Sequence, residues 1–175
     1  GGIINIVTKS GGNEHHLDIS VYYQDARLQL KCSSCDETPN NLSLAANINV
    51  GGPIVKDKLW YYVSAEVPFT RGQQTPDQQV FPDVARDAYP AREFLGFYGL
   101  AKLTFQPTDN QTFKLLFQSD PARINNTGQN PNRHPDAERQ QIQGGFTIAF
   151  ISETFLTENL FWNNKVAFIN STLKI

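Results

Sequence analysis

The chain consists of strand-like runs whose connections alternate between very long and very short. Each run alternates apolar with polar side chains, which is typical of a β-strand with unlike environments on its two sides. The seven runs are Leu17–Tyr23, Leu42–Val50, Leu59–Val67, Leu95–Phe105, Phe113–Gln118, Ile142–Ser152 and Leu160–Ile169. A membrane-spanning β-barrel has this rhythm, because tight turns join its strands on one side of the membrane and long loops on the other.

The connections are polar and rich in turn-forming residues. The long ones are predicted at Asp25–Asn41, Pro68–Glu93 and Ser119–Gln141, and the short ones at Lys56–Lys58, Pro107–Asn110 and Leu156–Asn159. Loops as long as the first set count against a compact soluble domain but are ordinary on the outer side of a barrel. Gly51-Gly52-Pro53 is expected to break or bend the second run, because proline cannot donate a ladder hydrogen bond.

Composition agrees with a barrel better than with a packed globule. Hydrophobic residues make up 39% of the chain and aromatic residues 11%, with twelve Phe and six Tyr, while the mean hydropathy is −0.40. Low hydropathy combined with many aromatics suits a sheet that is apolar on its outer face and wet on its inner face.

Charged side chains in the middle of strands share the polar side of the alternation. They are Asp18, Glu66, Lys102, Lys114 and Lys165. A lysine facing lipid at the middle of the bilayer costs roughly 2–4 kcal/mol, whereas one facing water costs little. We therefore predict that these five side chains face a water-filled lumen.

Aromatic residues gather where the strands meet the short turns. They are Trp60, Tyr61, Phe105, Phe113, Phe161 and Trp162. In a barrel they would form the interfacial girdle at the edge of the bilayer. The alternative is that they fill the core of a soluble all-β domain.

Several classes of function lack support in the sequence. The formal net charge is −2 and the basic residues are scattered among acidic ones, which gives no electrostatic track for nucleic acid. His15 and His16 are adjacent in a strand and point to opposite faces, so they cannot share a metal ion. No nucleophile elbow or phosphate-binding loop is present, and we expect neither an enzyme nor a bound cofactor.

The cysteines are Cys32 and Cys35, in the motif Cys-Ser-Ser-Cys. A zinc site needs four ligands, and a redox motif of this kind should open a helix in a βαβ unit. Neither context surrounds this pair. We expect a disulfide that closes a small loop in an oxidising compartment.

Seven strands cannot close a bacterial single-chain barrel, which has an even number, and open edges are not tolerated in lipid. The chain begins with Gly1-Gly2 and contains no Met. We therefore expect an internal piece of a longer protein, with the missing strands beyond Ile175.

Two stretches resemble the TonB-dependent outer-membrane receptors. GGIINIVTKSGGNE at Gly1–Glu14 resembles the junction between the plug domain and the first barrel strand of that family. VGGPIVKDKLWYYVSAE at Val50–Glu66 resembles its second strand, periplasmic turn and third strand. The amino-acid sequence of these two stretches is most similar to that of the large Oar-like receptors, in which a carboxypeptidase-regulatory-like domain precedes the plug.

The resemblance implies a 22-stranded outer-membrane barrel that encloses a plug and imports a nutrient with energy from TonB. It implies that residues 1–12 are the last plug strand and linker, and that residues 13–175 are the N-terminal part of the barrel. The expected partners are outer-membrane lipid, the TonB complex through a segment outside this chain, and surface or periplasmic accessory proteins. Two alternatives stay open: an adhesion or assembly barrel that does not transport, and a secreted all-β module that binds glycans.

Overall fold

The protein forms one antiparallel β-sheet. The computed structural model describes residues 9–28, 41–72, 79–85, 88, 90–128 and 132–175. The strands are β1 His16–Asp25, β2 Leu42–Val55, β3 Leu59–Gly72, β4 Arg92–Gly96, β5 Tyr98–Thr108, β6 Gln111–Ser119, β7 Ala122–Thr127, β8 Arg139–Thr157 and β9 Leu160–Lys174. Two short 3₁₀ helices, η1 Ala26–Leu28 and η2 Pro135–Ala137, follow β1 and precede β8.

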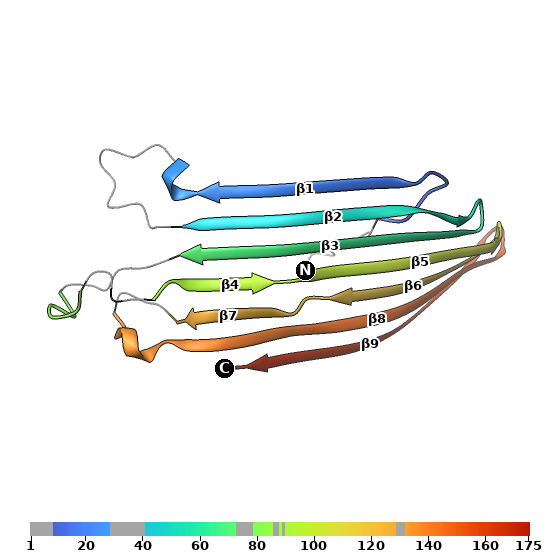
Figure 1. The fold of residues 1–175 in the computed structure, drawn as a ribbon. Coiled ribbons are helices and arrows are strands. Elements are labelled where there is room, and N and C mark those ends of the chain that lie inside the picture. Colours follow the sequence, from blue (N-terminus) through green and yellow to red (C-terminus); the bar gives the residue numbers. More distant parts are fainter. Residues whose placement is uncertain (1–8, 29–40, 73–78, 86–87, 89, 129–131) are drawn as a thin grey trace.

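The strands follow one another across the sheet in chain order (Figure 1). β4 and β5 lie end to end and both pair with β3, while β7 and β6 lie end to end and both pair with β8. The sheet is therefore seven strands wide, and each position corresponds to one of the seven predicted runs. The prediction of an all-β antiparallel architecture is confirmed.

The connections alternate in length as predicted. Two-residue and three-residue turns join β2 to β3, β5 to β6 and β8 to β9. These turns lie together at one end of the sheet, and the strand ends that flank the long connections lie at the other end (Figure 1). We call these ends the turn end and the loop end. Asp57 sits in the first turn with a φ of 62°.

Two of the predicted long loops are wrong in extent. In the stretch Pro68–Glu93, residues 68–72 belong to β3, which ends at Gly72, and residues 92–93 belong to β4. The stretch Ser119–Gln141 contains the whole of β7 and the start of β8. These segments are short and mostly polar, with isolated apolar residues such as Phe69 and Ile124, so they carry no sustained alternation. Backbone hydrogen bonds to neighbouring strands hold them extended.

Of the two expectations for Gly51-Gly52-Pro53, a break or a bend, the break is wrong, because β2 runs through to Val55; the register is irregular between Pro53 and Val55. Pairing with β1 ends at Gly51, which lies opposite His16. Beyond this point β3 is the one strand among the described residues that pairs with β2, so the missing amide proton of Pro53 can face the side without a paired strand at no cost to the ladder.

A proline explains why two other strand positions are interrupted. Pro121 accepts a hydrogen bond of 2.9 Å from the Phe97 amide but has no N–H to return, so β4 separates from β5 and β7 from β6. The facing residue is Gly144, with a φ of +104°. A Cβ atom there would lie 2.1 Å from the Asp120 carbonyl oxygen, so only glycine fits.

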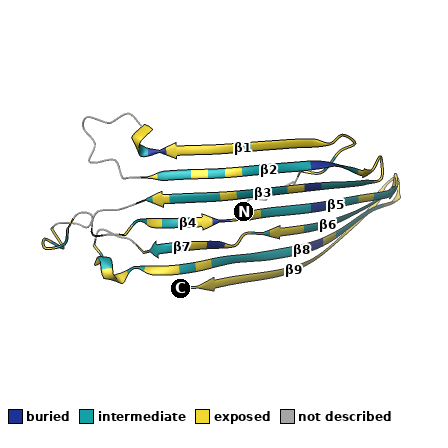
Figure 2. Ribbon diagram, viewed as in Figure 1, coloured by how far each residue is buried: buried dark blue, intermediate teal, exposed yellow. Residues whose placement is uncertain are grey.

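The sheet is a single layer. Among the described residues, buried positions are few and, apart from Asp25 at the end of β1, lie on the inner strands, whereas the rest of β1 and all of β9 are largely exposed (Figure 2). Val63 and Val67 on β3, for example, are 40% and 43% exposed. No helix in the described ranges is long and apolar enough to cross a bilayer.

Candidate functional site

The register of the sheet assigns each strand residue to one of two faces. One hydrogen-bonded row runs through Leu17, Val50, Val63, Ala101, Phe117, Ile148 and Phe168. The row beside it on the opposite face runs through Asp18, Asn49, Ser64, Leu100, Gln118, Thr147 and Ile169. We call these two sides the apolar face and the polar face.

All five charged residues predicted from the alternation lie on the polar face. Asp18 is on β1, Glu66 on β3, Lys102 on β5, Lys114 on β6 and Lys165 on β9. That this face encloses water stays a prediction.

Hydrogen bonds link polar side chains of the first three strands across this face. Asn49 Nδ2 donates to Asp18 Oδ1 at 3.2 Å and to Asn47 Oδ1 at 2.5 Å. The hydroxyl of Tyr62 donates to Asn49 Oδ1 at 3.0 Å, and Asn47 Nδ2 lies 3.4 Å from Glu66 Oε2. The sheet therefore presents a connected surface of amides and carboxylates.

Two lysines on the polar face have defined partners. Lys114 Nζ lies 2.5 Å from Glu153 Oε2 on β8, one strand away. Lys102 is 8% exposed, and its Nζ donates to Ser10 Oγ at 2.8 Å. Ser10 precedes β1, the first of the described strands, so this bond places residues just before β1 against the polar face at β5.

Asn13 fastens the same segment to the turn end. Its Oδ1 accepts hydrogen bonds from the Asp57 amide at 3.0 Å and from Trp60 Nε1 at 2.8 Å, while its Nδ2 donates to Asp57 Oδ1 at 2.5 Å. At Gly11 a Cβ atom would lie 2.2 Å from the Tyr61 carbonyl oxygen. We call these contacts of Gly11 and Asn13 with residues 57–61 the N-terminal clasp.

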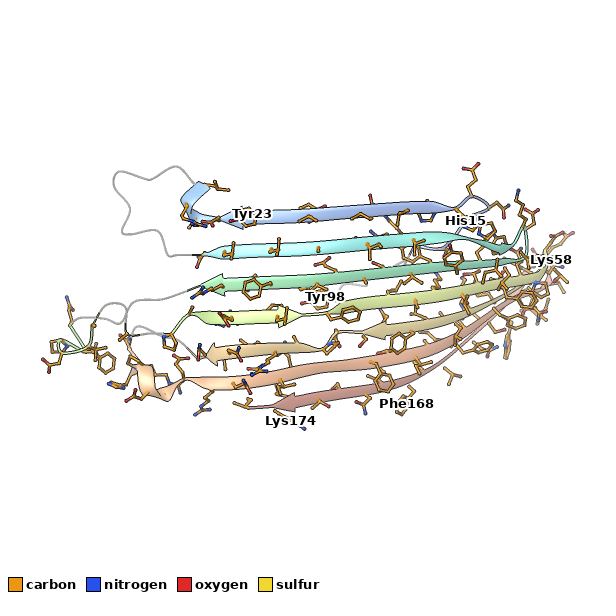
Figure 3. The ribbon with its side chains drawn as sticks, in the orientation of Figure 1. His15, Tyr23, Lys58, Tyr98, Phe168 and Lys174 are labelled. Atoms are coloured by element: carbon orange, nitrogen blue, oxygen red, sulfur yellow. The ribbon has the colours of Figure 1, made fainter. Side chains whose placement is uncertain are left out.

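A depression of about 330 Å³ lies on the polar face beside the interruption at Pro121. Its polar lining comes from side chains of Asn47, Ser64, Glu66, Tyr98, Gln118, Asp120 and Thr147. Tyr98 lies near the middle of the sheet (Figure 3). Amides, hydroxyls, carboxylates and one aromatic ring give this surface the chemistry to hydrogen-bond a polar solute or another protein segment.

The histidines occupy the positions that strand geometry requires. The ring of His15 contacts Tyr61 and that of His16 contacts Tyr62, so the two rings lie on opposite faces. Within the described residues no group of three or more His, Cys, Asp and Glu could hold a metal ion. Cys32 and Cys35 lie outside the described residues, so the expected disulfide stays a prediction.

The apolar face carries a ladder of exposed rings near the turn end. Phe113 lies between Phe105 and Phe150, with ring centroids 6.4 and 6.0 Å away. Trp162 shares this face by register. Trp60 does not, because it pairs with Thr104 on the polar face and its indole contributes to the N-terminal clasp. Phe161 is also on the polar face by register, because it alternates with Trp162 and pairs with Phe155. The expected girdle on the apolar face is therefore wrong at Trp60 and Phe161.

Comparison with known proteins gives two relatives. The chain is 36% identical over 83 residues, or 43% of its length, to "TonB-dependent transporter Oar" of Myxococcus xanthus. It is 25% identical over 169 residues, or 93% of its length, to "Probable TonB-dependent siderophore receptor PirA" of Acinetobacter baumannii. The chain is a distant relative of TonB-dependent transporters.

The match covers only part of those proteins. The chain spans 8% of the length of the Oar transporter and 21% of that of PirA. No protein-family model matches the chain, and no solved structure matches it. The names of both relatives describe transport or reception.

Sequence reasoning missed the two contacts of the N-terminal segment. Nothing in the alternation links Ser10 to Lys102, since 92 positions separate them. A signal was present at Lys102, whose charge lies in mid-strand between Ala101 and Leu103 and must find a polar partner or water. No comparable signal marked Asn13.

Proposed function

We propose that the chain is the N-terminal part of a 22-stranded outer-membrane barrel of a TonB-dependent receptor, which imports a nutrient into the periplasm. The observation that carries the proposal is a single-layer sheet of seven antiparallel positions with one apolar and one polar face. Each of these positions is long enough for a membrane-spanning strand of about 9–11 residues.

The exposure of the apolar face supports a lipid environment. On β1 the outward side chains Leu17, Ile19, Val21 and Tyr23 are 54–66% exposed. In water such a row would cost roughly 25 cal/mol for each Å² of apolar surface left uncovered. Lipid covers it without a second protein layer.

The apolar stretch also shifts along the strands in the way that a tilted barrel requires. Leu17 and Phe168 lie in one hydrogen-bonded row. Toward the loop end, the outward apolar stretch of β1 closes at Tyr23, which lies in the row of Lys174, whereas that of β9 closes at Phe168, six positions nearer the turn end. The shift is six positions over six strand-to-strand steps. About one residue per strand corresponds to a tilt of roughly 35°, within the range of membrane barrels.

We propose that residues 1–12 are the last plug strand and linker and that the barrel begins at residue 13. The contacts of the N-terminal segment agree with this boundary. Ser10 lies against the polar face at Lys102, and Asn13 lies at the turn end. A plug entering the barrel from the periplasmic side would lead into the first strand by this path. The turn end would then face the periplasm, and energy would reach the plug through TonB.

Cysteine labelling of the native protein tests the membrane assignment. Val63 and Ser64 are neighbours on β3 that lie on opposite faces. We expect Val63→Cys to react in cells with a lipid-soluble maleimide and to resist a charged one. Ser64→Cys is the matched control and should show no such preference for the lipid-soluble reagent. Equal reaction of Val63→Cys with both reagents would refute the assignment.

Dependence on TonB distinguishes transport from the adhesion alternative. The name of PirA specifies a siderophore, so uptake of radiolabelled ferric siderophores is the first assay, followed by other nutrients. We expect uptake that requires the protein and stops when TonB is deleted. A barrel that passes the labelling test but cross-links to no TonB in intact cells would instead favour adhesion or assembly.

A further inference from the structure

The polar face carries an exposed aromatic ring among amides, hydroxyls and carboxylates. Tyr98 is the first residue of β5 and lies opposite Glu66 on β3. Its side chain is 44% exposed. Trp60 and Tyr62 on the same face donate hydrogen bonds to neighbouring asparagines. Tyr98 instead presents the surface of its ring to the space above the sheet.

Tyr98 lines the depression of about 330 Å³ beside the interruption at Pro121. Ligand pockets usually have volumes of about 300–1,000 Å³, so this one suits a small solute or one unit of a longer one. β5 begins at Tyr98 and β6 ends at Ser119, so the depression lies where these two strands stop. Every strand that lines it pairs on both sides within this chain, so it does not lie at an edge of the sheet.

Planar polar side chains surround the ring. Asn47 lies in the same row as Glu66, and Gln118 lies in the next row toward the turn end. Asn47 Nδ2 lies 3.4 Å from Glu66 Oε2, and Asp120 Oδ1 accepts from the Gly145 amide at 2.9 Å. Each contact uses one oxygen of its carboxylate, so the other oxygen can accept a hydrogen bond from a ligand.

The charge of the depression disfavours an ionic ligand. Its described lining residues include Glu66 and Asp120 but no Lys, Arg or His, so an anion would be repelled. The two carboxylates come from strand positions on either side of β5. Neighbouring strands lie about 4.8 Å apart, so these residues are about 10 Å apart at the backbone and do not form one cation site.

We propose that this depression binds a neutral, hydroxyl-rich solute, namely one sugar ring of a saccharide. The inference rests on the proposed receptor function and names the class of its substrate. Tyr98 stacks on one face of the sugar ring, because the negative face of a phenol attracts C–H groups. The amides of Asn47 and Gln118 donate to sugar oxygens, and the carboxylates of Glu66 and Asp120 accept from sugar hydroxyls.

Binding of oligosaccharides by the native full-length protein in detergent tests the proposal. The probes are maltotriose, cellotriose, mannotriose and xylotriose, and the comparison solute is trigalacturonic acid, which carries three carboxylates. Titration calorimetry should show saturable binding of at least one neutral trisaccharide and at least tenfold weaker binding of the anionic one. Affinity should stay within twofold as salt rises from 50 to 300 mM, because a neutral ligand makes no ionic contact.

Tyr98→Ala should weaken this binding at least tenfold. Tyr22→Ala is the matched control, since Tyr22 is also exposed on the polar face but does not line the depression, and its affinity should stay within twofold of wild type. If Tyr98→Ala does not fold, Gln118→Ala serves, because Gln118 is exposed, and at least a threefold loss is expected.

Three results would overturn the proposal: no saturable binding of any of the four trisaccharides, equal losses in Tyr98→Ala and Tyr22→Ala, or equal binding of trigalacturonic acid. The first is the result expected if a plug segment fills the depression in the native protein. A fall in affinity with rising salt would also overturn the proposal, by indicating a charged ligand. Each of these outcomes leaves the labelling of Val63→Cys and the dependence of uptake on TonB unchanged, so failure of this inference is distinguishable from failure of the proposed receptor.

Discussion

Lys102 Nζ and Ser10 Oγ are 2.8 Å apart, although 92 positions separate the two residues. The contact joins the segment before the first strand to the polar face of the fourth position in the sheet. Lys102 is almost completely covered in this arrangement, so its charge depends on polar partners rather than on bulk water.

Removing the hydroxyl of Ser10 should loosen the N-terminal segment. A hydrogen bond to a charged group contributes about 1.5–3 kcal/mol, so a double-mutant cycle of Ser10→Ala and Lys102→Met should give a coupling of about 1–2 kcal/mol. Amide hydrogen exchange at residues 9–13 measures the opening. A coupling near zero would show that the segment is held by other contacts.

Asn13→Ala should open the N-terminal clasp. The substitution leaves the Asp57 amide and the Trp60 indole without their acceptor, at a cost of about 1–3 kcal/mol for a donor left unsatisfied. Amide hydrogen exchange at residues 57–61 should become faster as this turn loses its contacts with Asn13. Asn159→Ala, in the turn between β8 and β9, is the control and should leave exchange at residues 57–61 unchanged.

Gly144→Ala should destabilise the sheet where β7 departs from β6. Its φ is +104°, and the added methyl group would collide with the Asp120 carbonyl. The strain of such a backbone is about 1–3 kcal/mol before the collision is counted. Gly12→Ala is the matched control, because nothing lies within 4 Å of a Cβ at that position. Unfolding in denaturant should show a loss of at least 2 kcal/mol for the first and less than about 0.5 for the second.

The carboxyl group of Glu138 should make the loop end sensitive to pH. Both carboxylate oxygens are buried, and neither has a hydrogen-bond partner among the described residues. Burial raises the pKa of Glu138 above its ordinary value, and Arg133 opposes the shift. The folded state therefore binds this proton more tightly than the unfolded state, whose pKa is about 4.3.

The sign of the effect follows from linkage. A group with a raised folded pKa contributes stability below its unfolded pKa and loses it as pH rises through the folded value. Hydrogen exchange in residues 132–139 should accordingly be slower at pH 4 than at pH 7, after correction for the intrinsic rate. Glu138→Gln should slow exchange at pH 7 and abolish the difference, whereas Asp136→Gln at an exposed position should not. Persistence of the difference in Glu138→Gln would assign it to another group.

The sequence determined the seven strand positions, because alternation with a period of two is a local property that separates the faces of every amphipathic strand. It also determined the tight turns and the face on which Asp18, Glu66 and Lys114 lie. It did not reveal β7 or the loop-end extension of β3, because these segments are short and mostly polar and their isolated apolar residues, such as Ile124 and Phe69, make no sustained alternation.

Only the tertiary structure decided which residues of different strands lie opposite one another in the sheet. Register brings Pro121 opposite both Phe97 and Gly144, which interrupts two strands at once, and folding brings Ser10 to Lys102 and Asn13 to Trp60. These contacts join residues far apart in the chain, and their energies depend on partners that no local pattern specifies. The same reason explains why Asn47, Tyr98 and Thr147, which lie on three different strands, line one depression.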